Sequence, residues 1–178
     1  MEIRKATLAD FDSVFKIVLD CKEEMNKMGI EQWPAHHPSK ETIQKGIESN
    51  CHYVLIDQEK IVAGVLLNHS GDEQYKLVNW KINDPNPLLV HRLAVSPQAQ
   101  GKGYAKKLMI FAEELAKKEG SKSIRLDTYK NNSVSNKFYE NLGYKLVGVI
   151  RMPQYMPGEY NCYEKILDWI FSSLINEN

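Results

Sequence analysis

The chain has 178 residues, which is enough for one domain with a sizeable buried core. Its 23 Lys and Arg balance 23 Asp and Glu, so the net charge at pH 7 is zero and gives no support for binding to nucleic acid. No stretch approaches the length of a membrane span, and the first residues, MEIRKATLAD, contain no apolar leader, so we expect a cytoplasmic protein.

Cysteine usage is consistent with that expectation. Cys21, Cys51 and Cys162 are scattered, odd in number and without a C-x-x-C pair. They therefore indicate reduced thiols rather than a disulfide framework or a zinc site, and we expect no metal.

The first part of the chain is predicted to form a strand and two helices. Residues 2–6 make a short strand, and Thr7 with Asp10 forms a capping-box pattern at the start of a helix that Gly29 ends. Ser39 is expected to cap a second, shorter helix. The first helix should bury one apolar stripe, made of Leu8, Phe11, Phe15, Val18 and Met25.

The middle of the chain is predicted to consist mainly of strands. Residues 53–56 and 61–67 flank a tight turn and favour a hairpin. Residues 75–82 are ambiguous and compatible with a further strand. An apolar strand is predicted at 90–95, and Pro97 ends it because proline cannot donate to a strand ladder.

A turn with two glycines then starts an amphipathic helix at Gly103, and Gly120 is expected just past its end. The inward face follows helical spacing and consists of Ala105, Leu108, Met109, Ala112, Leu115 and Ala116. Glycines at a helix N-terminus let backbone N–H groups approach an anion, and the helix dipole favours phosphate there. Lys102, Lys106 and Lys107 add positive charge, so this stretch indicates an anion cradle for a phosphorylated cofactor.

The motif at this turn narrows the choice of cofactor. A Rossmann loop requires G-x-G-x-x-G, but Lys106 occupies the third glycine position, and the Walker pattern is absent. What remains is Q-x-x-G-x-A at Gln100, Gly103 and Ala105. This pattern resembles the pyrophosphate loop of the GCN5-related N-acetyltransferases (the GNAT family), which bind acetyl-coenzyme A.

A second stretch strengthens the resemblance. Residues 132–144, NSVSNKFYENLGY, resemble the family's second signature, N-x-x-A-x-x-F-Y-x-x-x-G-[FY], with Ser135 in place of the usual alanine. The two signatures lie in the expected order. The resemblance extends more loosely over residues 1–167, so we expect a single N-acetyltransferase domain over 1–178, with a core of 1–167 and a short C-terminal extension.

The resemblance also implies an α/β fold. In the GNAT fold a mixed central sheet has helices on both faces, and its central strands splay apart to hold acetyl-coenzyme A. The rest of the chain fits this order, with a strand at 123–128, a helix at 133–141 and paired strands at 144–150 and 160–167. Residues 168–174 are compatible with a terminal helix.

Cofactor contacts follow from the same resemblance. It implies that backbone groups of Leu93, Ala94 and Val95 pair with the pantetheine arm, and that one of their N–H groups polarises the thioester carbonyl. Asn132 is expected to bond the same arm, although its position equally suits helix capping. The remaining expected contacts are Gln100, Gly101, Lys102, Gly103, Tyr104, Ala105, Lys106, Ser135 and Phe138.

Tyr139 is the candidate acid for transfer of an acetyl group from a thioester to an amine. The family places a tyrosine here with its hydroxyl near the sulfur, and a phenol with a pKa of about 10 stays protonated at pH 7 and can donate to a thiolate. The alternative is a core tyrosine beside Phe138.

Asp127 is the candidate base. A lysine-type amine has a pKa of about 10.4, so its lone pair must be freed by a base or a water chain. Some ribosomal-protein N-acetyltransferases of this family carry a glutamate at the same spacing from Asn132, and Asp127 is one methylene shorter. The alternative for Asp127 is an ordinary salt bridge to Arg125 or Arg92, and His91 on the central strand is another candidate base.

The acceptor is expected to bind near the loop at 29–38. Aromatic side chains at such a site suit a flat or cationic amine, with surface packing as the alternative. Two adjacent histidines in this loop, His36 and His37, suggest metal only weakly because no partner spacing supports them. The candidate acceptor residues are Glu31, Trp33, His36, His91 and, from a later loop, Tyr155.

The sequence thus predicts an acetyl-coenzyme A-dependent N-acetyltransferase acting on a primary amine of a small molecule, amino acid or peptide. The alternatives are a protein N-terminal or lysine acetyltransferase, and a non-catalytic acyl-coenzyme A sensor, against which the intact Tyr139 argues. The expected partners are acetyl-coenzyme A and an amine acceptor, with no nucleic acid and no membrane, and a homodimer is left open.

Overall fold

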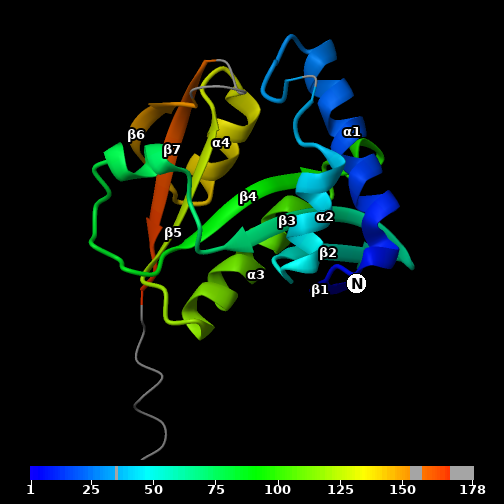
Figure 1. Cartoon of the computed structure of the whole chain (residues 1–178), viewed down its shortest axis with the longest axis horizontal. Coiled ribbons are helices and arrows are strands. Elements are labelled where there is room, and N and C mark those ends of the chain that lie inside the picture. Colours follow the sequence, from blue (N-terminus) through cyan, green and yellow to red (C-terminus); the bar gives the residue numbers. More distant parts are fainter. Residues whose placement is uncertain (35, 153–157, 169–178) are drawn as a thin grey trace, which may run out of the picture.

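The computed structural model describes residues 1–34, 36–152 and 158–168. A seven-stranded sheet forms its centre, with the strand order β1-β2-β3-β4-β5-β7-β6 (Figure 1). The strands are β1 (Glu2–Lys5), β2 (His52–Asp57), β3 (Lys60–Asn68), β4 (Leu88–Val95), β5 (Ser123–Tyr129), β6 (Lys145–Arg151) and β7 (Glu159–Ile166). The helices are α1 (Phe11–Lys27), α2 (Lys40–Glu48), α3 (Tyr104–Lys118) and α4 (Ser133–Asn141), with 3₁₀ helices at Leu8–Asp10, Glu73–Leu77 and Pro97–Ala99.

The sheet is mixed, and helices cover both of its faces. β4 pairs with β5 in parallel, whereas the other neighbouring strands in the described residues pair antiparallel. α1 and α2 pack on one face of the β2–β4 part, and α3 and α4 pack on the opposite face of the sheet (Figure 1). The predicted α/β fold, with helices on both faces of a mixed sheet, is therefore confirmed.

β4 and β5 separate part of the way along their length. Their parallel pairing joins residues 88–90 of β4 to residues 124–126 of β5. β4 continues to Val95 and β5 to Tyr129, so the remaining residues of the two strands share no backbone pairing with each other. The predicted splay of the central strands is confirmed, and it opens a gap that Figure 1 shows between the two halves of the sheet.

A β-bulge lies in β4 beside this gap. Gly64 of β3 pairs with Ala94 and Leu66 with His91, so one residue of β3 stands opposite two of β4. Arg92, one of those two, has a φ of 51°. This left-handed conformation costs a non-glycine residue about 1–3 kcal/mol, and bulges of this kind are common next to active sites.

The buried face of α1 differs from the predicted stripe. Of that stripe, Val18 is buried, Phe11, Phe15 and Met25 pack at the margin of the core, and Leu8 is 57% exposed. Leu8 lies in the 3₁₀ turn before α1, where three residues per turn put it out of phase with the helix. The residues that α1 buries are Val14, Ile17, Val18 and Cys21.

α3 buries the predicted face. Its fully covered side chains include Leu108, Met109, Ala112 and Ala116. Both ends of the helix carry glycines in the left-handed region, Gly103 with a φ of 79° and Gly120 with a φ of 80°. The glycine signals therefore marked the start and the end of this helix correctly.

Residues 75–82, where a strand was considered, do not form one. The chain instead makes the 3₁₀ helix Glu73–Leu77, which Asp72 caps by accepting a hydrogen bond from a backbone N–H. Tyr75 and Val78 then pack on the face of the sheet formed by β4, β6 and β7. The cap and this packing favour the 3₁₀ turn over an extended strand.

The terminal helix considered at 168–174 lies outside the described residues, apart from Asp168. Among the described helices, none combines the length and the apolar character that a membrane span requires.

Candidate active site

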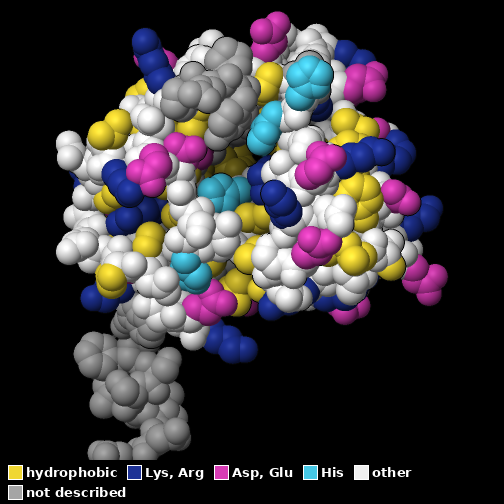
Figure 2. All heavy atoms as spheres, in the orientation of Figure 1, with side chains coloured by type: hydrophobic (Ala, Val, Ile, Leu, Met, Phe, Trp, Pro, Cys, Tyr) yellow, Lys and Arg dark blue, Asp and Glu magenta, His cyan; other side chains and the backbone are white. Residues whose placement is uncertain are grey.

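Two cavities meet where β4 and β5 separate. We call the first the cradle cavity; it has a volume of about 490 Å³ and is lined by residues that include Val95, Gln100, Gly101, Ala105, Asn132 and Phe138. We call the second the histidine cavity; it has a volume of about 390 Å³ and its wall includes His37, His91, Arg92, Asp72, Tyr75 and Asp127. Figure 2 shows a hollow in this face of the molecule, with histidine side chains at its rim.

The two cavities share part of their walls. The residues that line both are Gln32, Trp33, Leu93, Ser135 and Tyr139. Molecules in the two cavities would therefore meet along these side chains. Such an arrangement suits a reaction between two substrates that enter from different sides.

The start of α3 provides an anion cradle beside the first cavity. Gly101 and Gly103 have φ values of 78° and 79°, and apart from their chain neighbours no residue comes within 4 Å of where their side chains would begin. Their backbone is therefore free to face a ligand at the positive end of the helix. A hollow at the start of α3 is lined by these two glycines and by Gln100, Ala105 and Lys106.

Tyr104 and Lys102, two of the expected cofactor-binding residues, differ from the others in how they can contact the cofactor. Tyr104 is buried, and its hydroxyl donates a hydrogen bond to Asp57 at 2.6 Å, so its side chain is held in the core. Lys102 is exposed and lies outside the residues that line the cavities. Tyr104 can therefore serve the cradle through its backbone N–H, and Lys102 through its charge.

Asn132 uses different atoms for two tasks. Its Oδ1 accepts a hydrogen bond from the backbone N–H of Ser135 at 3.0 Å and so caps α4. Its Nδ2 donates to Gln32 at 2.8 Å at the wall of the cradle cavity. The capping alternative is thus correct for one atom, and the amide group still lies where a ligand in this cavity would pass.

Tyr139 lies on the shared wall of the two cavities. It is buried on α4, among the rings of Phe138, Tyr144 and Tyr163 at centroid distances of 5.2, 6.0 and 6.1 Å. Burial, together with the nearby charge of Asp127, raises the pKa of the Tyr139 hydroxyl. The phenol therefore stays protonated at neutral pH and faces the point where the cavities join.

Asp127 lies in the wall of the histidine cavity at the free part of β5. Loss of hydration raises the pKa of its carboxyl to about 6, and Asp72 adds to this effect, while a hydrogen bond from the Tyr75 hydroxyl at 2.5 Å opposes it. Neither salt bridge considered for Asp127 is formed. Arg125 pairs with Glu164 at 2.9 Å, and Arg92 has no ion pair among the described residues.

The histidines of the cavity are neutral. His91 lines the wall, and its Nε2 lies 3.2 Å from the Asn68 amide oxygen. Burial and the charge of Arg92 lower the pKa of His91 to about 4. Burial lowers the pKa of His37 as well. Both imidazoles are therefore weaker bases than an ordinary histidine.

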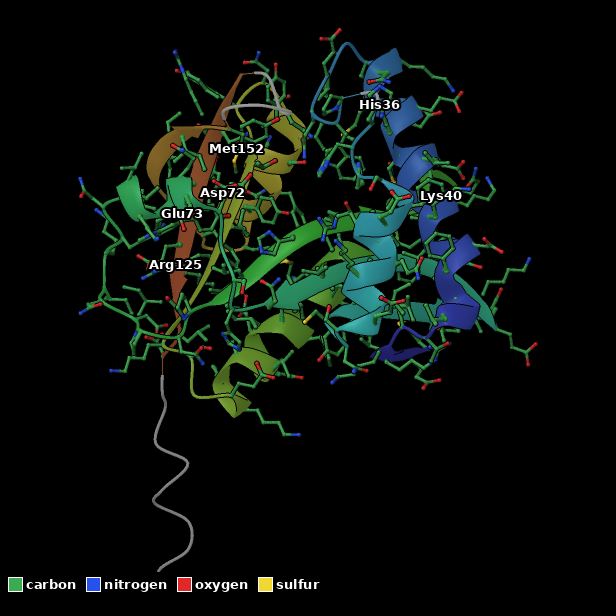
Figure 3. All side chains as sticks on the ribbon, in the orientation of Figure 1. His36, Lys40, Asp72, Glu73, Arg125 and Met152 are labelled. Carbon is green, nitrogen blue, oxygen red and sulfur yellow. The ribbon has the colours of Figure 1, made fainter. Side chains whose placement is uncertain are left out.

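The acceptor residues proposed from the sequence are only partly brought together. Trp33 and His91 line the histidine cavity. Glu31 and His36 are exposed and do not line it; His36 lies on the outer part of its loop (Figure 3), and its neighbour His37 faces the cavity instead. Tyr155 lies outside the described residues.

Several residues of the site were missed. Tyr75 reaches Asp127 across 52 positions of sequence, and Gln32 reaches Asn132 across 100. Such contacts leave no local pattern. A weak signal existed for Tyr75, because Asp72 followed by polar residues is a typical N-cap, and a 3₁₀ turn there directs the tyrosine inward.

The described residues contain no cluster of three or more His, Cys, Asp or Glu side chains arranged to hold a metal ion.

Comparisons with known proteins agree with this geometry. A model of the acetyltransferase (GNAT) family matches residues 11–144. Over 145 residues the chain is 24% identical to YesJ of Bacillus subtilis (strain 168), an uncharacterized N-acetyltransferase, covering 80% of this chain and 81% of YesJ.

Solved structures show the same fold. A GNAT family acetyltransferase from Streptococcus agalactiae 2603 matches with a TM-score of 0.82 and 23% identity, over 94% of this chain and 95% of that one. The PaiA N-acetyltransferase from Thermoplasma acidophilum, solved in complex with coenzyme A, matches with a TM-score of 0.69 and 23% identity, over 93% of this chain and 98% of that one. The family match spans more than half of the chain, and the fold agrees with it, so this chain belongs to the acetyltransferase (GNAT) family and is an acyltransferase.

Proposed function

We propose that the protein transfers the acetyl group of acetyl-coenzyme A to a primary amine of a small molecule, amino acid or peptide. The observation that carries this proposal is the position of Tyr139 on the wall shared by the cradle cavity and the histidine cavity, with Asp127 in the second cavity. The coenzyme A complex of the PaiA relative supports the choice of donor.

The donor would occupy the cradle cavity. The start of α3 would bind the pyrophosphate through backbone N–H groups, and the pantetheine arm would pass Asn132 and the free part of β4, residues 93–95. The bulge at Arg92 frees backbone groups of β4 from β3 beside this path. One of these N–H groups would polarise the thioester carbonyl and stabilise the oxyanion that forms there.

Asp127 would take the proton of the acceptor's ammonium group. Because the pKa of its carboxyl is about 6, about 90% of it is ionised at pH 7, yet it is a stronger base than an ordinary aspartate. The freed lone pair attacks the carbonyl carbon, and a C–N bond forms.

Tyr139 would then protonate the leaving group. The C–S bond breaks, and the thiolate takes the proton of the Tyr139 hydroxyl. During the same collapse the nitrogen gives up its second proton to the Tyr139 phenolate, which restores the phenol, and Asp127 releases the first proton to solvent. A high pKa suits this acid, because the phenol keeps its proton until a strong base such as a thiolate appears beside it.

The volume of the histidine cavity, about 390 Å³, suits a small acceptor. A panel of small amines, incubated with acetyl-coenzyme A, should release coenzyme A thiol and yield N-acetylated product. Tight binding of acetyl-coenzyme A without transfer to any amine would contradict the enzymatic proposal and favour the sensor alternative. Transfer to protein N-termini or protein lysines alone would contradict this proposal and favour the protein acetyltransferase alternative.

A further inference from the structure

The histidine cavity contains a cation, Arg92, that has no counter-charge among the described residues. The other arginines of the chain, Arg4, Arg125 and Arg151, each pair with a carboxylate. Arg92 forms no ion pair within the described residues, and its Nε is buried without a hydrogen-bond partner. Arg92 also lies in the strained bulge of β4, with a φ of 51°. Strain of this kind persists where the surrounding structure enforces it, often at functional sites.

The groups around Arg92 do not neutralise it. His37, His52 and His91 are its titratable neighbours, and burial together with the charge of Arg92 lowers the pKa of each. For His52 and His91 the pKa is about 4, so these rings are neutral at pH 7. The guanidinium itself stays protonated, because arginine keeps its charge even when burial lowers its pKa.

The acidic side chains of the histidine cavity lie on a different wall from Arg92. Arg92 packs toward α1, where it lines a small hollow together with Val14 and Ile17. Asp127 comes from β5, and Asp72 from the start of the 3₁₀ helix on the other side of the gap (Figure 3). The partners that set the pKa of Asp127 are Tyr75 and Asp72. The cavity is therefore basic on its α1 side and acidic on its β5 side.

Arg92 does not fit a role in holding the phosphates of coenzyme A. It lines neither the cradle cavity nor the hollow at the start of α3. The anion that it would bind must therefore enter the histidine cavity, which is the acceptor's side of the site.

Resting on the proposed N-acetyltransferase function, we propose that the acceptor is a small amino acid-type zwitterion whose carboxylate pairs with the Arg92 guanidinium. Its amine then faces Asp127 and the thioester. A planar guanidinium can bind a carboxylate through two parallel N–H···O bonds, which fixes the orientation as well as the charge of the acceptor. Both ends of the zwitterion thus meet the opposite charge.

The test compares matched pairs of acceptors on the wild-type protein. Each pair is a free amino acid and its carboxamide, taken from a series that runs from glycine through β-alanine to longer ω-amino acids and includes α-amino acids with larger side chains. We expect kcat/KM to favour the carboxylate by about 10–100-fold in the preferred pair, as charge-assisted hydrogen bonds predict. A carboxylic acid of the same length without the amine should compete with the acceptor.

Variants then assign this preference to Arg92. Arg92→Gln should reduce the preference to less than about threefold by raising KM for the carboxylate, while Arg92→Lys should retain part of it because the charge remains. Binding of acetyl-coenzyme A should be unchanged in both. Arg151→Gln removes an arginine whose side chain is 80% exposed and lines neither cavity, and it should leave the preference intact.

The outcomes separate the two proposals. Equal rates with carboxylates and carboxamides in the wild-type protein would overturn the carboxylate site but leave the N-acetyltransferase function in place. An equal loss for both acceptors in a folded Arg92→Gln protein would also overturn it, because Arg92 would then act on the reaction itself. No transfer to any amine would overturn the proposed function, and the zwitterion with it. The wild-type comparison and the competition assay decide the question even if Arg92→Gln does not fold.

Discussion

At the scale of single residues, removing the hydroxyl of Tyr139 distinguishes a catalytic role of this side chain from a packing role. Tyr139→Phe keeps the ring and its contacts, so the fold and the affinity for acetyl-coenzyme A should change little. If the hydroxyl protonates the thiolate, kcat should fall by about 10–10³-fold. Single-turnover rates should be measured as well, because slow product release can hide a loss in the chemical step.

A matched control lies beside Tyr139. Tyr144 belongs to the same ring cluster, with centroids 6.0 Å apart, but its buried hydroxyl lines neither cavity. Tyr144→Phe should therefore keep a normal single-turnover rate. A normal rate in Tyr139→Phe as well would mean that water or another group protonates the thiolate.

The pair formed by Tyr75 and Asp127 predicts a pH dependence. A base must be deprotonated to act, so kcat/KM should fall as the pH decreases through about 6, the pKa of the Asp127 carboxyl. The Tyr75 hydroxyl stabilises the ionised carboxylate by donating to it. Tyr75→Phe removes this hydrogen bond and should raise the pKa, so the acid limb of the profile should move to higher pH.

The controls for this profile are direct. Tyr144→Phe should leave the acid limb in place, since its hydroxyl lies outside the cavity wall. Asp127→Asn should lower kcat/KM by about 10²–10⁴-fold. If the limb stays unchanged in Tyr75→Phe, or if Asp127→Asn costs less than about threefold, the base is His91 or water.

At the scale of elements, the two ends of α3 offer a paired test of the cradle. Gly103 and Gly120 have nearly the same φ, 79° and 80°, and apart from its chain neighbours neither has a residue within 4 Å of the point where a side chain would begin. Gly103→Asp places a negative charge at the helix start, where the pyrophosphate is proposed to bind, and calorimetry should show a large loss of affinity for acetyl-coenzyme A.

Gly120→Asp imposes the same backbone strain at the far end of the helix. It should lower the melting temperature to a similar extent but leave the affinity for acetyl-coenzyme A unchanged. An unchanged affinity in Gly103→Asp would exclude the cradle from cofactor binding, whereas a loss of the same size in both variants would indicate a general defect in α3.

The elements also show what local patterns can predict. The face of α3 was predicted correctly because a long amphipathic helix between two glycines has a single consistent phase. The predicted apolar stripe of α1 was wrong at Leu8, because the 3₁₀ turn before the helix places this side chain out of phase with the helical repeat. The strand considered at 75–82 does not form, because the Asp72 cap and the burial of Tyr75 favour a 3₁₀ helix in that segment.

At the scale of the whole molecule, the site depends on contacts that join distant parts of the chain. The splayed strands were predicted through the family resemblance that the signatures at Gln100 and Asn132 carry, and both signatures follow a strand that flanks the gap. Arg92 and Tyr75 were missed because their importance arises only when α1, β4, β5 and the 3₁₀ helix enclose one cavity. The charge on each wall is a property of the assembled fold.

A charged base in such a cavity should lower the stability of the whole molecule. The pKa of Asp127 is about 6 in the folded protein against an ordinary value of 3.8. The folded state thus binds a proton more tightly than the unfolded state, and stability should decrease as the pH rises from about 4 to 6 and then level off. Asp127→Asn removes this charge and keeps an acceptor for Tyr75, so at pH 8 the variant should be more stable than the wild type by about 1–3 kcal/mol.

Urea unfolding at pH 5 and pH 8 measures this difference, which should shrink at pH 5. Asp10→Asn is the matched control with the opposite sign. Hydrogen bonds from Arg4, the first of which is 2.7 Å long, lower the pKa of the Asp10 carboxyl, so this carboxylate stabilises the fold at pH 8 and its loss should lower the free energy of unfolding there. A less stable Asp127→Asn protein at pH 8 would show that the carboxylate is compensated in the folded state, and the raised pKa that suits Asp127 as a base would be wrong.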